Sequence, residues 1–300
     1  MSAAPDGVLL LDKPAGFSST QALARCKRLL GSRKAGHTGT LDPFATGLLP
    51  LVFGEATKFS RFLIDSTKGY RATLRLGQES STGDTEGVVT DPRPFTLDER
   101  RIDEVLATFV GYSDQVPPMH SAVRIAGRRL YELAREGLEV PREARRIHVQ
   151  ELSRVSFDGR DLVISVTCSK GTYVRTLAED LGRAFGCGAY LTALRRTRIG
   201  PFLEPDGIGL ETLQALGEAG ARERLLPVDV LVRDVPRCEA SPDDAWRFTR
   251  GQEIDCPQAR PGAEFAVFEA GGRFLGVGRG AAPARLAPLR LLATAERQIP

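Results

Sequence analysis

One short stretch of the 300-residue chain, GSRKAGHTGTLDPFATGLLP at residues 31–50, combines side chains that could do chemistry with residues that shape a loop. His37 brings an imidazole, and Asp42 brings a carboxylate five positions later. An imidazole can transfer protons, and a correctly aimed carboxylate can act as a covalent nucleophile. Which chemistry applies depends on the structure of the stretch, for which there are three interpretations.

The first interpretation is a phosphate-binding loop. Gly31 to Thr38 matches the pattern G-x-x-x-x-G-K-[ST], except that His37 replaces the lysine. That lysine supplies a permanent cation over the phosphates, which a neutral imidazole cannot replace. A predicted helix also precedes the loop, where the pattern requires a strand. The sequence therefore argues against nucleotide hydrolysis.

The second interpretation is an ordinary helix start. Asp42-Pro43 is typical of a helix that begins with an aspartate N-cap and a proline in its first turn, and Pro50 would end it. This interpretation does not explain the run GHTGT at residues 36–40. Small and hydroxyl-bearing residues let a backbone approach a sugar-phosphate chain closely. The third interpretation is therefore a loop that presents Asp42 to RNA.

The composition is that of an ordinary globular chain, with 42% hydrophobic and 26% charged residues. Five cysteines are scattered without a CxxC pair and there are three histidines, so we expect free, buried thiols and no metal site. No apolar run approaches the roughly 20 residues of a membrane helix, and the N-terminus lacks the features of a secretory signal. We expect a cytoplasmic protein without membrane association.

The distribution of charge says more than the net charge of +3. Two stretches, residues 18–41 and residues 183–200, contain basic residues and no acid. Such one-sign stretches suit a polyanion, although solvated basic faces would look the same in sequence. The basic residues are Arg25, Lys27, Arg28, Arg33 and Lys34 in the first stretch, and Arg183, Arg195, Arg196 and Arg198 in the second.

Hydrophobic periodicity predicts the elements that must position these residues. Ser18 or Ser19 can cap a helix that ends at Gly31, and Tyr70 lies on the apolar face of an alternating strand. The other signals predict an α+β fold whose β-rich tail forms a small barrel. Strands are predicted at 7–11, 70–76 and 162–168, helices at 19–30, 59–63, 97–110, 174–185 and 210–219, a linker at 227–244, and a hairpin around Gly271-Gly272.

Several segments together resemble the TruB family, the synthases that make pseudouridine in the T-loop of tRNA, at position 55 of the tRNA. They follow the family's order over most of residues 7–202 and are specific in combination. The segments are GVLLLDKPAGFSS, KAGHTGTLDPFATGLLPL, GEATKFS, KGYRATLRLG, STGDTEG, PPMHSAVRIAGRRLYELAREGLEVPRE, CSKGTYVRTLAEDLG and LRRTRIGPF.

The resemblance implies a domain organisation. Residues 1–232 would form the pseudouridine synthase domain, built on a mixed, mostly antiparallel sheet flanked by helices. A charge-rich, mobile surface insertion at about 117–146 would clamp the RNA. Residues 233–300 would form a PUA-like RNA-binding domain that contacts a distal part of the tRNA.

The resemblance also implies roles for the catalytic residues. Asp42 would be the nucleophile, attacking either C1′ of the ribose or C6 of the base. Arg175 would keep that carboxylate ionised and aimed, since a nearby opposite charge lowers its pKa. Independently, Arg175 lies near the start of a predicted helix, where a cation opposes the helix dipole by roughly 0.3–1 kcal/mol and needs an offset. Tyr70 would stack on the target base and help to remove the C5 proton.

Further residues would bind the substrate. His37 would occupy the space that a flipped uridine vacates, and Asp84 would belong to a supporting network. The other predicted substrate-binding residues are Lys13, Thr38, Gly39, Tyr173 and Leu194.

The expected partner is tRNA, bound through its T-arm and, through the C-terminal domain, its acceptor stem. The chemistry needs no cofactor and no metal, and we expect a monomer without an obligatory protein partner. Two alternatives stay open. One is the guide-RNA-dependent relative, which works with protein partners; the compact chain without lysine-rich tails argues against it. The other is a tRNA-binding or tRNA-folding protein in which catalysis is incidental.

Overall fold

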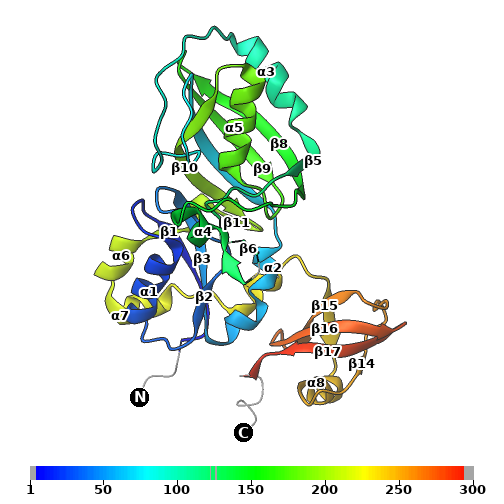
Figure 1. Cartoon of the computed structure of the whole chain (residues 1–300). Helices are drawn as coiled ribbons and strands as arrows, with labels where there is room; N and C mark the ends of the chain where they lie inside the picture. Colours follow the sequence, from blue (N-terminus) through cyan, green and yellow to red (C-terminus); the bar gives the residue numbers. More distant parts are fainter. Residues whose placement is uncertain (1–4, 122, 126, 294–300) are drawn as a thin grey trace.

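A large sheet forms the centre of the protein in the computed structural model, which describes residues 5–121, 123–125 and 127–293. Its strand order is β12-β1-β3-β10-β4-β9-β8-β5, with β2 beside β3 and β11 beside β10 (Figure 1). The pairs β1·β12 and β3·β10 are parallel, and the remaining pairs are antiparallel. The strands are β1 Gly7–Lys13, β2 Ala35–His37, β3 Thr46–Phe53, β4 Lys68–Leu76, β5 Gly111–Gln115, β8 Arg145–Phe157, β9 Asp161–Cys168, β10 Ala189–Ile199, β11 Phe202–Leu203 and β12 Ile208–Gly209.

Helices flank this sheet, so the predicted α+β class is confirmed. Ser18 caps α1 by accepting the Gln21 amide, while the Gln21 side chain accepts the Ser18 amide in return. The apolar stripe of α5 packs against β10, and α5 ends at Gly186, whose φ of 78° favours glycine. The helices are α1 Ser19–Leu29, α2 Arg61–Ile64, α3 Glu99–Thr108, α5 Val174–Phe185, α6 Leu210–Ala215 and α7 Gly217–Glu223, with 3-10 turns at Gly54–Phe59, Glu204–Asp206 and Val228–Val232.

The predicted β-rich tail is a curled five-stranded sheet in the order β13-β15-β16-β17-β14 (Figure 1). Gly272, with a φ of 82°, lies in the turn between β15 and β16, as the glycine pair predicted. A shared apolar cluster joins this sheet to the rest of the chain, and the Phe59 and Phe274 rings meet edge to face at 5.3 Å. The elements are β13 Arg237–Ala240, α8 Pro242–Thr249, β14 Ile254–Asp255, β15 Glu264–Glu269, β16 Phe274–Ala282 and β17 Arg285–Leu291.

The interpretation of Asp42-Pro43 as a helix start is wrong. Residues 42–45 form a loop, and Thr46–Phe53 form strand β3, paired with β1 over seven registered positions from Gly47↔Lys13 to Phe53↔Gly7. Nearly every residue of β3 is buried. Local capping signals cannot compete with that burial and with the strand partners on both sides. Pro50 therefore does not end a helix but lies within the strand.

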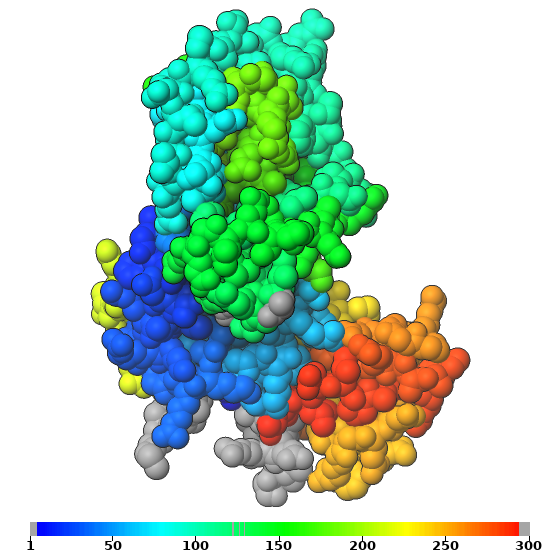
Figure 2. All heavy atoms as spheres, in the orientation of Figure 1, coloured from blue at the N-terminus to red at the C-terminus, as the bar shows by residue number. Residues whose placement is uncertain are grey.

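Two other segments are more ordered than a linker or a plain surface loop. The predicted linker at 227–244 contains a 3-10 turn with buried Val230, Leu231 and Val232, and then strand β13, so the linker prediction is wrong there. The insertion at 117–146 holds the hairpin β6 Arg124–Ile125 and β7 Arg128–Arg129, followed by α4 Leu130–Arg135. Its position on the surface is visible in Figure 2, where the green segment crosses the middle of the face.

The five cysteines are free and buried, as predicted. Within residues 5–293, apart from 122 and 126, no helix is long and apolar enough to cross a bilayer. The same described residues contain no cluster of three or more histidine, cysteine, aspartate or glutamate side chains suited to a metal ion.

Candidate active site

Asp42 lies on the loop between β2 and β3, which α1 and β1 brace. The Ser19 hydroxyl donates to the Leu41 carbonyl at 3.0 Å and accepts the Leu41 amide at 2.7 Å, tying the loop to the first turn of α1. The Gly16 amide donates to the Pro43 carbonyl at 2.8 Å. The Asp42 side chain is 31% exposed and faces Arg175. The loop therefore holds one carboxylate at the surface of a rigid frame.

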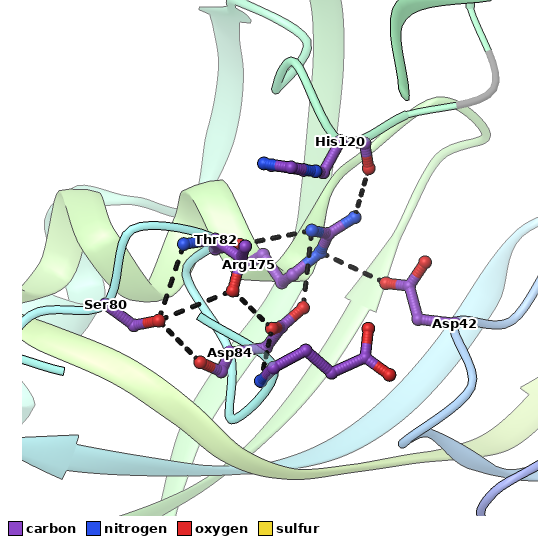
Figure 3. A network of polar contacts seen from close by, with 7 residues as sticks. Asp42, Ser80, Thr82, Asp84, His120 and Arg175 are labelled. Carbon is purple, nitrogen blue, oxygen red and sulfur yellow. Dashed lines mark hydrogen bonds and ion pairs between the residues drawn. The ribbon is translucent and has the colours of Figure 1, made fainter. Parts of the chain in front are cut away.

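Arg175, in the first turn of α5, joins the two sides of the site. Its Nε lies 3.1 Å from Asp42 Oδ2, and its Nη1 lies 3.3 Å from Asp84 Oδ2 (Figure 3). It also donates to the Thr82 carbonyl at 3.1 Å and the His120 carbonyl at 2.6 Å. Two carboxylates thus supply the offset that a buried cation near a helix start requires.

Asp84 is held from its other side by the turn that contains it. Its Oδ1 accepts the Thr82 hydroxyl at 2.6 Å and the Glu86 amide at 3.0 Å. The Ser80 hydroxyl donates to the Asp84 carbonyl at 2.6 Å (Figure 3). Asp84 is 1% exposed, so its carboxylate reaches little but this network. The network fixes Arg175 and leaves Asp42 as its one partly open carboxylate.

The electrostatics of the site act on Asp42 in two directions. Burial raises the pKa of the Asp42 carboxyl above its usual value, and the nearby Asp84 adds to that rise. The Arg175 guanidinium opposes the rise in pKa by favouring the ionised form. A partly buried carboxylate aimed by a guanidinium suits a nucleophile, because burial has already removed part of the solvent that would have to leave before it attacks.

Three of the predicted substrate-binding residues brace the loop. Lys13 is fully buried, and its Nζ donates to the carbonyls of Pro14, Phe17 and Pro43. Burial lowers the pKa of Lys13 to about 8, with Asp42 acting in the opposite direction. Thr38 is buried and donates through its amide and its hydroxyl to the Pro50 carbonyl. The Gly39 backbone adopts a φ of 145°, which an L side chain rarely does.

Tyr70 and Leu194 lie on one face of the sheet. Tyr70 is half-buried and shares its face of β4 with buried Ala72 and Leu74, and Ala72 pairs in register with Leu194 of β10. Burial raises the pKa of the Tyr70 hydroxyl, while the Arg196 guanidinium lowers it. The predicted apolar face of this strand is therefore confirmed, with Tyr70 at the end nearest Asp42's loop.

His37 and Tyr173 belong to different elements, His37 to β2 and Tyr173 to the start of α5. His37 ends β2, and its Nδ1 is buried without a hydrogen-bond partner in the described part of the chain. Burial and the Arg196 charge both lower the pKa of His37, which favours the neutral imidazole. Tyr173 lies just before α5, and the Gln115 side-chain amide binds its backbone. The Tyr173 amide donates to Gln115 Oε1 at 2.8 Å, and Gln115 Nε2 donates to the Tyr173 carbonyl at 3.2 Å.

The sequence missed four groups that build this site: the Thr82 and His120 carbonyls, the Gln115 amide and the Arg196 guanidinium. The interpretation of Arg196 as part of a stretch that faces a polyanion is wrong, because Arg196 is 1% exposed. Its spacing of two from Leu194 could have revealed this, since both then share a strand face. The Thr82 and His120 carbonyls belong to the backbone, so no residue type in the sequence marks them as part of the site.

Solved structures with this fold include a protein complex and a ribonucleoprotein. The chain is similar to a structure described as "Crystal Structure of a Cbf5-Nop10-Gar1 Complex", with a TM-score of 0.73 and 25% identity, over 96% of this chain and 84% of that one. A second, "Structure of H/ACA RNP bound to a substrate RNA containing 2'-deoxyuridine", has a TM-score of 0.75 and 24% identity, over 97% and 86%. The second likeness concerns the fold alone.

Curated relatives match nearly end to end. A protein of Azoarcus sp. (strain BH72) is 50% identical over 290 residues, 96% of this chain and 95% of its own length. A protein of Burkholderia mallei (strain NCTC 10247) is 50% identical over 295 residues, 96% of this chain and 97% of its own length. Both relatives are named tRNA pseudouridine synthase B.

Family models cover almost the whole chain. Residues 27–174 match the TruB family pseudouridylate synthase (N terminal domain), residues 175–233 the tRNA pseudouridylate synthase B C-terminal domain, and residues 236–292 Pseudouridine synthase II TruB, C-terminal. The fold and these matches define the class of protein as a pseudouridine synthase. Within that class, the chain belongs to the TruB family.

Proposed function

We propose that this chain isomerises uridine to pseudouridine in tRNA, at the T-loop uridine at position 55. Relatives at 50% identity carry the name tRNA pseudouridine synthase B, which supports tRNA as the substrate. The observation that carries the proposal is the contact between Asp42 and Arg175 at 3.1 Å, on a partly open carboxylate in a braced loop.

Asp42 acts as the nucleophile in the proposed reaction. Its carboxylate oxygen bonds to C1′ of the ribose or to C6 of the base, the N1–C1′ bond breaks, and the uracil turns over. A C5–C1′ bond forms, the bond to Asp42 breaks, C5 loses its proton and N1 gains one. Product and substrate are isomers, so no redox or group-donating cofactor is consumed. Arg175 holds the carboxylate ionised and aimed throughout.

The uridine has to leave its stack before this chemistry, at a cost of a few kcal/mol. His37 is proposed to fill the vacated space. Tyr70 is proposed to stack on the extruded base and to take part in removing the C5 proton. Tyr173 and Leu194 complete the walls, with Lys13, Thr38 and Gly39 shaping the loop and Asp84 anchoring Arg175.

The rest of the molecule binds the tRNA in this proposal. Residues 1–232 act as the catalytic domain, the insertion at 117–146 clamps the T-arm, and residues 233–300 act as a PUA-like domain that contacts the acceptor stem. The chain works in the cytoplasm as a monomer, without guide RNA, protein partner, cofactor or metal. The mostly exposed basic residues of α1 and the loop that follows supply charge for RNA phosphates: Arg25, Lys27, Arg28, Arg33 and Lys34.

The test is an Asp42→Asn variant on an unmodified T-arm hairpin labelled with tritium at C5 of the target uridine. The wild-type chain alone, without guide RNA, should release the label, and the variant should be slower by more than about 1,000-fold. Asp91→Asn, at an exposed aspartate, is the matched control and should keep wild-type turnover. Conversion by Asp42→Asn at the wild-type rate overturns the role of Asp42. Binding without conversion by the wild-type chain leaves a tRNA-binding protein instead.

A further inference from the structure

Arg196 is the largest of the fully buried side chains in the described chain, at 1% exposed. It lies on β10 between two strands of the site, paired in register with Tyr70 of β4 and with Gly47 of β3. Within the described residues it forms no ion pair with a carboxylate. A buried guanidinium without a carboxylate partner is costly, so its hydrogen bonds must compensate for lost water.

The hydrogen bonds of Arg196 close the Asp42 loop from both ends. Its Nε donates to the Leu48 carbonyl at 2.6 Å, and its Nη2 donates to the Gly39 carbonyl at 3.2 Å. Asp42 lies between those two carbonyls in the chain. One rigid, planar group therefore sets the distance between the start and the end of the loop.

Two glycines lie close to Arg196, and one of them, Gly47, leaves no room for a side chain. A Cβ on Gly47 would lie 2.3 Å from the Arg196 carbonyl oxygen, and one on Gly39 would lie 3.4 Å from Arg196 Nη1. Gly47 also has a φ of 101°. The β3 backbone at Gly47 thus approaches the Arg196 backbone closely, which explains a glycine there, whereas a Cβ at Gly39 would make only ordinary contact with the guanidinium.

Arg196 is also the register partner of Tyr70 on β4, so the two side chains are neighbours on one face of the sheet. The positive charge of Arg196 lowers the pKa of His37, of Lys13 and of Tyr70. The surroundings of Arg196 therefore favour negative charge, and Tyr70 is its cross-strand neighbour.

We propose that Arg196 is a positioning residue for the proposed reaction: one guanidinium holds the Asp42 loop closed at both ends, and the same side chain sets the position of Tyr70, its register partner on β4. This inference rests on the proposed function for its effect on rate. It assigns Arg196 no contact with RNA phosphate, because the side chain is buried. The nucleophile loop and the base-stacking tyrosine are thus set by the same group, although they come from different strands.

The experiment compares Arg196→Met, which removes the charge and the donors, with Arg196→Lys, which keeps a charge but not the planar fork. Affinity for tRNA should stay within about twofold for both variants, while the single-turnover rate should fall by about 100-fold or more in Arg196→Met and by less in Arg196→Lys. Arg75→Lys, on β4 and paired with Asp161 away from the loop, is the matched control and should keep the wild-type rate.

Two further readouts separate positioning from a general loss of stability. In a double-mutant cycle, Arg196→Met should cost much less in a Tyr70→Phe background than in the wild type, since Tyr70→Phe already removes the hydroxyl of the cross-strand partner of Arg196. Amide hydrogen exchange of residues 39–48 should accelerate in Arg196→Met, and less in Arg196→Lys, without a matching change across β8 and β9. If Arg196→Met does not fold, Arg196→Lys replaces it in the rate measurement, in the double-mutant cycle and in the hydrogen-exchange measurement.

Equal losses of affinity and rate would overturn the proposal, because Arg196 would then act on RNA binding. Full additivity with Tyr70→Phe together with unchanged exchange at 39–48 would also overturn it. The exchange measurement requires no turnover. A wild-type chain that makes no pseudouridine would therefore defeat the proposed function while the positioning of the loop by Arg196 could still be tested.

Discussion

Two basic stretches that look alike in sequence differ in where they place their arginines. Arg28 and Arg33, on α1 and the loop after it, are exposed, whereas Arg196 is buried inside the sheet. Its neighbour Arg195 forms ion pairs with Asp12 and Glu204. The difference shows that a run of basic residues predicts positive charge but not whether that charge faces solvent or the interior. On a helix surface the charge is free for a polyanion, and on a central strand alternate residues must face the interior.

The comparison of buried and exposed basic residues separates two roles for cations in this protein. Buried guanidinium groups hold reacting side chains, so their loss should reduce the rate of chemistry. Exposed cations attract the tRNA backbone, so their loss should reduce affinity in a manner that depends on salt. Four variants measure how far this separation holds, beginning with the largest expected effect.

Arg175→Met should have the largest effect, because it leaves Asp42 and Asp84 as neighbouring carboxylates without their shared cation. The single-turnover rate should fall by about 1,000-fold. The free energy of unfolding should fall by about 3–5 kcal/mol, the range for a broken buried ion pair, as measured by urea denaturation. Arg154→Lys, at an ion pair on the outer surface, is the control. Wild-type turnover by Arg175→Met would mean that Arg175 contributes to folding and not to the rate of the reaction.

Asp84→Asn should slow the single-turnover rate by about tenfold, the equivalent of one charge-assisted hydrogen bond on Arg175. Its pH dependence is the sharper readout. Asp84 raises the pKa of Asp42, so its neutralisation should lower that pKa, and the rate should then persist to lower pH than in the wild type. The rate is measured from about pH 4.5 to 8. An acid limb that moves to higher pH would contradict the coupling between the two carboxylates.

Arg28→Gln combined with Arg33→Gln should weaken tRNA binding by several-fold and leave the rate at saturating tRNA within about twofold. The slope of log affinity against log salt should decrease by about two, because each substitution removes one cation that would neutralise a phosphate. Arg100→Gln, an exposed site on α3, removes one positive charge and serves as the control for net charge. An unchanged salt slope would mean that this stretch is a solvated face rather than an RNA contact.

Arg100→Gln should also show the smallest effect on stability. Arg100 pairs with Glu104 one helical turn away, and both side chains are at least half exposed. Such a pair contributes about 0.3–0.5 kcal/mol, which urea denaturation should resolve as a small shift in midpoint. A loss of stability comparable to that of Arg175→Met would mean that exposure does not distinguish structural cations from those that attract tRNA.

Local signals predicted the elements well where one stretch of chain contains the whole cause. The Ser18 cap, the alternation around Tyr70, the apolar stripe of α5 and the turn at Gly272 each depend on neighbours within a few residues. Local signals failed at Asp42-Pro43, where a typical capping pair lies in a loop before a strand. The cause lies far away, in the pairing of β3 with β1 and β10.

The sequence by itself determined the family, the fold class and the residue types that the chemistry requires, because these are carried by motifs and periodicity. Only the tertiary structure decided the geometry in which the charges meet. It brought Asp42, Asp84 and Arg175 together from three distant segments, and it turned Arg196 from an expected RNA contact into a buried support. The physical reason is that burial and strand pairing depend on partners remote in sequence, and these set both pKa and exposure.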